Sequence, residues 1–247
     1  MEHLTLKAQH GTRNAERRTR NTERGTRNAK HGTRNTEHGT RNAERGTRNT
    51  EHKTRNTKLI IQMATYISIL RGINVGGHNP VKMDALRLLY AELGYSAVQS
   101  YIQSGNIIFN SSLSDILYIE NSIREKIFET FGFNVSVLVM TTEELNSSLQ
   151  NNPFIKDKMK NPAFIHMTFL SGLPDKELVD KIPAGFYLPD EFLISGKTIY
   201  LYCPAGYGNT KLTNNFFENK LRLTATTRNL NTSNELLNLA EKNKNVN

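Results

Sequence analysis

Apolar residues follow two different patterns along this chain. Residues 1–62 carry no run of apolar positions with the spacing of a helix face or of a strand. From Met63 onward, short β-rich runs alternate with stripes of apolar residues at helical spacing. Only the second pattern can build a hydrophobic core, so we expect the folded part to begin near Met63.

Residues 63–152 predict the element order β-α-β-β-α-β, followed by a short helix. The longest of these helices carries isoleucines at helical spacing and ends before Gly132, a residue type that favours helix C-termini. Thr141 and Glu144 have the spacing of a capping box, which would start the short helix. The predicted strands are Tyr66–Leu70, Val98–Gln103, Ile107–Asn110 and Val135–Met140, and the predicted helices are 83–93, Asp115–Phe131 and 141–149.

Residues 153–247 nearly repeat this order. The predicted strands are Ala163–Leu170, Phe192–Ser195, Thr198–Cys203 and Leu223–Thr227, and the predicted helices are Asp175–Ile182, Lys211–Leu221 and a last helix capped by Thr232 and Glu235. The order βαββαβ is that of ferredoxin-like folds. We therefore predict an α+β protein with two ferredoxin-like half-domains in tandem, 63–152 and 153–247, packed together as one unit.

The N-terminal segment is a seven-residue repeat of the form Gly-Thr-Arg-Asn-(Ala/Thr)-Glu-(Arg/His). A coiled coil needs apolar residues at two positions of each heptad, and this repeat offers only Ala or Thr at one position and Gly at another. Each glycine costs a helix about 1 kcal/mol. We therefore predict a disordered, low-complexity tail over residues 1–62. We interpret it as a misassigned start upstream of Met63, and a basic arm that binds phosphates is the alternative interpretation.

The positive charge of the chain lies in that segment. The whole chain has 32 Lys and Arg against 23 Asp and Glu, a formal net charge of +9. Residues 1–62 hold 15 basic and 6 acidic residues, and the rest of the chain holds 17 of each. Nucleic-acid binding depends on concentrated positive charge, so we do not expect it of the folded part.

The composition also limits the chemistry. Cys203 is the one cysteine, which excludes a disulfide framework and a cysteine-based metal cluster within one chain. His78 and His166 are the histidines outside the tail, and no cluster with metal-ligand spacing accompanies them. No apolar run approaches the roughly 20 residues of a membrane span. We therefore expect a soluble cytoplasmic protein with no cofactor and no membrane partner.

Four separate segments of the folded part resemble one known family. They are Leu70–Gly77, Tyr101–Asn106, Lys211–Asn214 and Ala225–Asn229, and they resemble the bacterial family called domain of unknown function 1697 from Met63 to about Lys242. The resemblance implies tandem ferredoxin-like repeats and a start near Met63, and it implies no established activity. The family usually has Trp where this chain has Leu230, either to stack on a ligand or to pack.

The glycine-rich loop after the first strand is the main candidate site. Its backbone N–H groups could form an anion-binding nest, with Arg71 as a charged anchor. Alternatively, the glycines only allow positive φ in a long turn. The loop lacks the spacing of a phosphate-binding Walker A motif. The candidate ligand-binding residues of this loop are Arg71, Gly72, Asn74, Gly76 and Gly77.

Polar residues of three other segments could face the same ligand. Gln103, Ser104 and Asn106 form the turn of the first hairpin, and Arg228 and Asn229 end the last strand. Arg and Asn together can bind a phosphate or a carboxylate. The alternatives are a simple hairpin turn and a tie between the last helix and a neighbouring loop. Tyr200 and Tyr202 alternate with apolar residues, so we expect them to pack against the other half.

Three functions remain open from the sequence. The first is binding of a small anionic ligand at the glycine-rich loop. The second is an acylphosphatase-like hydrolase, in which Arg71 would bind the substrate and Asn106 would orient water, by fold-level analogy. The third is a non-enzymatic module that interacts with nucleic acid or protein. The sequence leaves open whether any reaction is catalysed.

Overall fold

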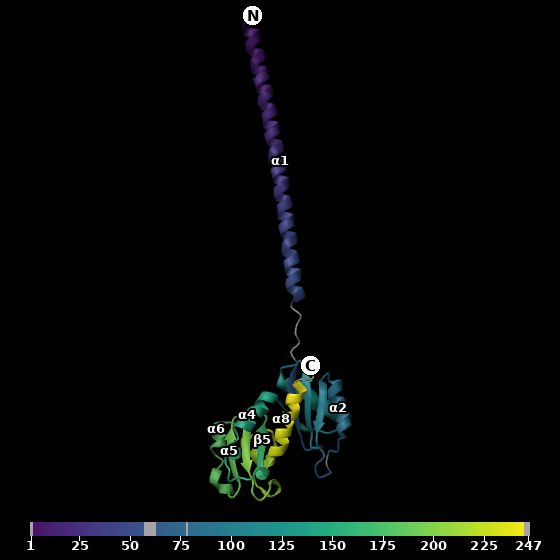
Figure 1. Ribbon diagram of the computed structural model, residues 1–247, viewed down its shortest axis with the longest axis vertical. Coiled ribbons are helices and arrows are strands. Elements are labelled where there is room, and N and C mark those ends of the chain that lie inside the picture. Colours follow the sequence, from purple (N-terminus) through teal and green to yellow (C-terminus); the bar gives the residue numbers. More distant parts are fainter. Residues whose placement is uncertain (1, 57–62, 78, 245–247) are drawn as a thin grey trace. The chain divides into compact units, whose positions relative to one another are not determined.

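The computed structural model describes residues 2–56, 63–77 and 79–244, and Figure 1 colours the chain by residue number. The chain divides into two compact units, Met1–Ile60 and Ile61–Asn247. Each unit is described by itself below. Within the described ranges, no helix is both long and apolar enough to cross a membrane.

The N-terminal unit is one α-helix, α1 (Glu2–Asn56), where the sequence predicted a disordered tail. Its backbone hydrogen bonds are made within the segment, and threonine hydroxyls add bonds to the preceding turn, as from Thr19 to the Ala15 carbonyl at 2.9 Å. The side chains of residues 15–41 are all exposed, so the helix buries no apolar face over this stretch. The predicted disorder of residues 1–62 stays a prediction. Residues 1 and 57–62 of the predicted tail lie outside the described residues.

The first half of the folded unit is a four-stranded antiparallel sheet with its helices. Its elements are β1 (Ala64–Arg71), α2 (Met83–Glu92), β2 (Ser96–Tyr101), β3 (Asn106–Ser111), α3 (Ile116–Phe131), β4 (Ser136–Thr141) and α4 (Thr142–Gln150). The strand order in the sheet is β2-β3-β1-β4. Asp115 caps α3, and Thr141 and Glu144 form the predicted capping box of α4.

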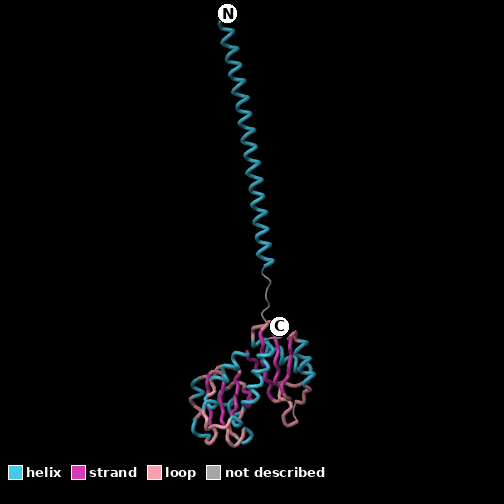
Figure 2. Tube along the Cα trace, in the orientation of Figure 1, coloured by secondary structure: helices cyan, strands magenta, loops and turns pink. Residues whose placement is uncertain are grey.

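The second half repeats this arrangement, after a short helix, α5 (Pro153–Lys156). Its main elements are β5 (Ile165–Leu170), α6 (Lys176–Val179), β6 (Glu191–Ser195), β7 (Thr198–Tyr202), α7 (Asn214–Leu221), β8 (Ala225–Asn229) and α8 (Leu230–Lys244). Three 3-10 turns lie at Pro162–Phe164, Ala184–Tyr187 and Tyr207–Asn209. The strand order is β6-β7-β5-β8, and Figure 2 shows the strands of both antiparallel sheets in magenta. The protein is therefore α+β.

Two helix starts in the second half differ from the predictions. Helix α7 begins at Asn214 rather than at Lys211, because Leu212 is fully buried and the Thr210 hydroxyl accepts the Leu212 N–H. Helix α8 follows β8 without a break and begins at Leu230. The Asn229 side chain accepts the Thr232 N–H at 2.8 Å, so Asn229 rather than Thr232 supplies the cap.

Three apolar cores hold the folded unit together. One lies between the first sheet and α2 and α3, and another lies between the second sheet and α6 and α7. The third joins the facing sides of the two sheets with α4 and α8, and it includes Ile67, Met140, Phe169, Tyr200 and Leu236. Figure 1 shows α8 in yellow between the strands of the two halves. Packing of Tyr200 against the other half is thereby confirmed.

The two halves also share one strand register. The Leu70 N–H donates to the Gly105 carbonyl at 2.8 Å, and the Leu170 N–H donates to the Lys197 carbonyl at 2.9 Å. Counting along the paired strands from these two leucines gives equivalent positions in the two halves. The equivalent pairs include Arg71 and Ser171, Ser104 and Gly196, Asn106 and Thr198, and Met140 and Arg228.

Candidate functional site

The glycine-rich loop after β1 is closed by its own hydrogen bonds. Gly72, Gly76 and Gly77 have φ values of 78°, 59° and 79°, and all three are exposed. The Asn74 side chain accepts the Val81 N–H at 2.8 Å and donates to the carbonyls of Val81 and Gln103, both at 2.9 Å. Asn74 therefore fixes the loop to itself and to the β2–β3 turn. His78 of this loop lies outside the described residues.

Arg71 joins the two halves of the folded unit. Its guanidinium contacts the Glu218 carboxylate and the Asn215 side-chain oxygen, both on α7. Glu218 also accepts the Ala225 N–H of β8 at 2.9 Å. The Arg71 guanidinium thus has a carboxylate partner within the fold, and a bound anion would have to compete with it.

Arg228 holds the end of β1 and the first hairpin turn against β8. All five of its N–H donors are used. They donate to Asn106 Oδ1 (2.6 Å), to Thr226 Oγ1 (3.2 Å), and to the carbonyls of Thr227, Leu70 and Ser104 (2.9 Å each). Burial lowers the pKa of Arg228 to about 10, against the opposing influence of Tyr207. We call Arg228 and these acceptors the Arg228 clasp.

The remaining predicted residues contribute to the clasp, to the glycine-rich loop or to a helix cap. Asn106 is fully buried, and its amide group donates to the Ser104 hydroxyl at 2.9 Å and to the Tyr101 carbonyl at 3.2 Å. Gln103 is exposed and contributes its backbone carbonyl to Asn74. Asn229 caps α8 as described above. The structure thus brings Arg71, Asn74, Ser104, Asn106 and Arg228 to one side of the molecule, where their polar atoms bond to the protein itself.

Sequence reasoning missed the side chains that extend this network into the second half. The Thr227 hydroxyl lies 2.6 Å from Thr168 Oγ1. It accepts a hydrogen bond of 3.0 Å from the Tyr207 hydroxyl and donates one of 2.6 Å to Asn214 Oδ1. Thr227 and Asn214 do lie in segments that resemble the family. Leu230 is buried in the core between the sheets, which makes it a packing position.

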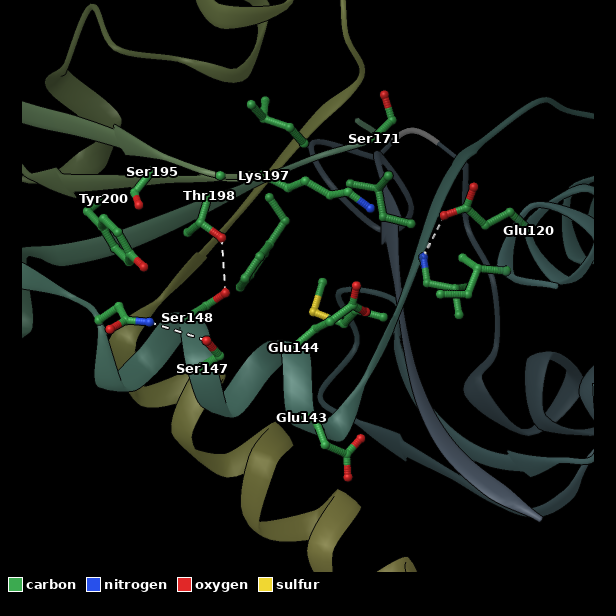
Figure 3. Close-up of a pocket in the computed structure, with 18 of the residues that line it drawn as sticks. Glu120, Glu143, Glu144, Ser147, Ser148, Ser171, Ser195, Lys197, Thr198 and Tyr200 are labelled. Atoms are coloured by element: carbon green, nitrogen blue, oxygen red, sulfur yellow. Dashed lines mark hydrogen bonds between the residues drawn. The ribbon is translucent and has the colours of Figure 1, made fainter. Parts of the chain in front are cut away.

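A cavity of about 810 Å³ lies elsewhere, between α3, β4 and α4 of the first half and the β5 end and β6–β7 turn of the second. We call it the inter-half cleft (Figure 3). Its floor is buried and mainly apolar, with Leu138, Met140, Phe169 and Leu170. Its polar groups include the hydroxyls of Ser147, Ser148, Ser171, Ser195, Thr198 and Tyr200 and the charged groups of Glu120, Glu143, Glu144 and Lys197.

Glu120 and Lys197 lie on opposite walls of this cleft. Glu120 is half-buried, and its Oε1 accepts the Val139 N–H at 2.8 Å. Desolvation raises the pKa of Glu120, against the opposing effects of the Val139 hydrogen bond, Arg124 and Lys197. Figure 3 shows the Lys197 side chain extending toward the wall that carries Glu120. Among the residues that the structure describes, the Lys197 ammonium has no hydrogen bond or ion pair.

The other two carboxylates of the cleft are engaged in the fold. Glu143 forms an ion pair with Lys244 at 2.5 Å. Glu144 accepts the Thr141 N–H at 2.9 Å as part of the capping box. A carboxylate with a raised pKa in a cavity is a common feature of functional sites. Glu120 is therefore the cleft residue of most chemical interest.

The histidine and cysteine environments indicate structural roles. His166 stacks on Tyr207 with ring centroids 4.9 Å apart, and burial lowers its pKa. Burial raises the pKa of the Cys203 thiol to about 11, which keeps it protonated and weakly nucleophilic. Within residues 2–56, 63–77 and 79–244, no group of three or more His, Cys, Asp and Glu side chains could hold a metal ion.

The sequence gives little sign of the cleft because its lining comes from common residue types in four separate segments. Glu120 occupies the polar side of an amphipathic helix, where a carboxylate is ordinary. The one local signal is the Gly196-Lys197 turn, which resembles any two-residue hairpin turn. Only the packing of the two halves brings these residues together.

Comparisons with known proteins agree with this architecture. The chain is similar to a conserved bacterial protein, SP0830 from Streptococcus pneumoniae, at 24% sequence identity and a TM-score of 0.59, over 72% of this chain and 99% of that chain. This likeness concerns the fold. No curated protein matches the chain. Residues 63–200 match the family described as "Protein of unknown function (DUF1697)", and the chain belongs to this family.

Proposed function

We propose that the folded unit binds a small molecule in the inter-half cleft. The observation that carries this proposal is the cleft itself, with about 810 Å³ of space, an apolar floor and opposite charges on facing walls. Ligand sites typically have volumes of roughly 300–1,000 Å³ and combine apolar walls with a few polar groups. The ammonium of Lys197, which forms no ion pair within the described part of the chain, and the half-buried carboxylate of Glu120 supply those groups.

We further propose that the halves, 63–152 and 153–247, are both ferredoxin-like, as predicted. The element order βαββαβ in each half and the matching strand orders support this assignment. The sheet face that such a half leaves open is covered here by the other half with α4 and α8. A ligand site between the halves is therefore the natural consequence of the pairing. The cytoplasm remains the expected compartment.

The glycine-rich loop remains a second candidate, for a small anionic ligand. Its three exposed glycines with positive φ favour this role, because they leave backbone N–H groups near solvent. The contacts of the arginines argue against it. Arg71 already has a carboxylate partner, and every N–H of Arg228 is used.

The two other functions have less support. An acylphosphatase-like reaction would need Asn106 to orient water, whereas its side-chain oxygen accepts from Arg228 and its amide group donates to Ser104 and Tyr101. Nucleic-acid binding by the folded part would need concentrated positive charge. Residues 63–247 hold equal numbers of basic and acidic residues.

A fragment-binding experiment tests the cleft. The full chain is screened with neutral, anionic and cationic fragments by ligand-observed NMR, and hits are repeated on Ser171→Trp, which fills the exposed rim of the cleft. Ser96→Trp, at an exposed position on the far edge strand β2, is the matched control. We expect hits to lose affinity in Ser171→Trp alone. Absence of hits, or equal binding by both variants, would contradict the proposal.

A further inference from the structure

The inter-half cleft and the Arg228 clasp occupy equivalent places in the two halves. The clasp contacts the residues Leu70, Ser104 and Asn106 of the first half. The shared register makes these residues equivalent to Leu170, Gly196 and Thr198 of the second half, and all three line the cleft. The cleft is therefore the counterpart of the socket that the Arg228 guanidinium fills.

The residues that fill the socket differ between the two ends. Met140 stands at the position equivalent to Arg228, and Ser171 stands at the position equivalent to Arg71. Both Met140 and Ser171 line the cleft. At the cleft, a thioether and a hydroxyl thus stand where the clasp end has the guanidinium groups of Arg228 and Arg71. The cleft keeps open space at the place that corresponds to the Arg228 guanidinium.

The lining of the cleft holds more carboxylates than ammonium groups. Three carboxylates line it against one ammonium; Lys244 pairs with Glu143, and the charges of Arg124 and Lys197 act on Glu120. Glu120 is half-buried, and in the described part of the chain no ion pair engages it. Carbonyl and carboxylate oxygens together are the acceptors that a planar guanidinium group prefers.

We propose that the inter-half cleft binds the guanidinium group of a small molecule, which takes the place that Arg228 takes at the other end. This inference rests on the proposed function and names its ligand class. The equivalent acceptors are the carbonyls of Leu170 and Gly196 and the hydroxyl of Thr198, which also shares a hydrogen bond of 3.0 Å with the Ser148 hydroxyl. The Glu120 carboxylate supplies the countercharge.

A matched pair of probes tests the charge and shape of the ligand. Agmatine carries a guanidinium group, and N-(4-aminobutyl)urea replaces that group with a neutral one of nearly the same shape. By isothermal titration calorimetry of the full chain, we expect agmatine to bind about tenfold more tightly or better, the effect of a charge-assisted hydrogen bond. Equal affinities, or binding of the urea alone, would overturn the inference.

Variants of one helix test the role of Glu120. We expect Glu120→Gln to weaken agmatine binding about tenfold, and Glu125→Gln, at an exposed position of α3, to leave it unchanged. Equal effects of the two variants would contradict the assignment. If neutral or anionic fragments occupy the cleft while agmatine does not bind, the guanidinium inference fails and the proposed function stands. If nothing occupies the cleft, the proposed function fails.

A final variant gives the inter-half cleft the arginine that fills the equivalent place in the Arg228 clasp. Met140→Arg places a guanidinium at the position equivalent to Arg228. We expect it to abolish agmatine binding, whereas Met140→Leu retains it. Agmatine binding by Met140→Arg with unchanged affinity would overturn the inference. Because a buried arginine can prevent folding, the comparison of the two probes on the unaltered chain remains decisive.

Discussion

The two ends of the interface between the halves have the same backbone frame and different contents. At one end, Arg228 reaches from β8 to the end of β1 and uses all five donors. At the other end, Met140 of β4 lies beside the end of β5, and a cavity of about 810 Å³ remains. The difference lies in side chains rather than in topology. A repeated fold thus gives one filled, structural end and one end with room for a ligand.

This comparison separates residues that hold the fold from residues that could serve a ligand. The polar groups near Arg228 are paired with one another, so they stabilise the contact between halves. The charged groups of Glu120 and Lys197 face each other across open space and form no ion pair among the described residues. Some hydroxyls of the cleft are also bonded within the fold, as Thr198 is to Ser148 and Ser171 is to the Thr224 N–H, so the charged groups of Glu120 and Lys197 are the ones that we expect a ligand to engage.

The largest expected effect is the loss of the Arg228 clasp. Arg228→Met gives this end the residue of the other end and leaves buried acceptors at Leu70, Ser104 and Asn106 without a donor. We expect a loss of unfolding free energy of about 4 kcal/mol in urea denaturation, since each unpaired buried group costs about 1–3 kcal/mol. Lys220→Met, at an exposed position, is the control. A loss no greater than that of the control would refute the structural role of Arg228.

The next effect compares the two hairpin turns. A Cβ atom at Gly105 would lie 2.7 Å from the Leu70 Cβ, and the φ of Gly105 is +75°. We therefore expect Gly105→Ala to reduce the unfolding free energy by about 3 kcal/mol, from overpacking and backbone strain. Lys197→Ala, at the equivalent position, should change it by less than about 0.5 kcal/mol. Similar losses of unfolding free energy in the two variants would mean that the two hairpin turns are packed equally tightly.

A smaller effect concerns the ion pair between Arg71 and Glu218. Each side chain is about a quarter exposed, with relative exposures of 26% and 23%. A double-mutant cycle with alanine should give a coupling energy of about 1 kcal/mol. A second cycle at Ser171 and Glu120 should give a coupling energy near zero, because Ser171, at the position equivalent to Arg71, carries no charge. Equal coupling energies in the two cycles would show that the clasp end and the cleft do not differ in this ion pair.

The smallest effect is a pH dependence at Glu120. Because its pKa is raised in the fold, the folded state holds that proton more tightly than the unfolded state does. The chain should therefore lose stability as pH rises from the ordinary glutamate value through the raised one. Relative to the unaltered chain, Glu120→Gln should gain melting temperature over this window. Thermal melts of both proteins between pH 3 and 8 measure this difference in melting temperature. If Glu120→Gln gained melting temperature relative to the unaltered chain as the pH fell, the predicted direction would be contradicted.

Much of the fold could be predicted from the sequence because its signals are local. Apolar spacing placed α3, and the Thr141–Glu144 capping box placed the start of α4. The start of α7 could not be predicted, because burial of Leu212 in the tertiary core keeps the preceding residues extended. The predicted disorder of residues 1–62 stays a prediction, because that segment has no apolar spacing from which a packed element could be predicted.

The candidate site was harder to predict than the fold. Arg71, Asn106 and Arg228 do come together, because the segments that carry them meet at one end of β1. The sequence could not tell that their donors are used by the protein itself, since this depends on atoms contributed by both halves. Glu120, Lys197 and Ser171 gave no signal because each is an ordinary surface residue in its own segment. Their proximity follows only from the packing of the halves.

The most direct test locates the site at which a guanidinium compound binds to the folded unit. The full chain, labelled with ¹⁵N and with ¹³C-methyl methionine, is titrated with agmatine, and the backbone amides and methionine methyl groups are followed by NMR. We expect the Gly196 amide and the Met140 methyl group to shift with a common affinity, and the Gly105 amide at the filled end to stay unchanged. Shifts at Gly105 without shifts at Met140 would show that the ends were assigned the wrong roles, and no shift at either end would contradict the guanidinium site.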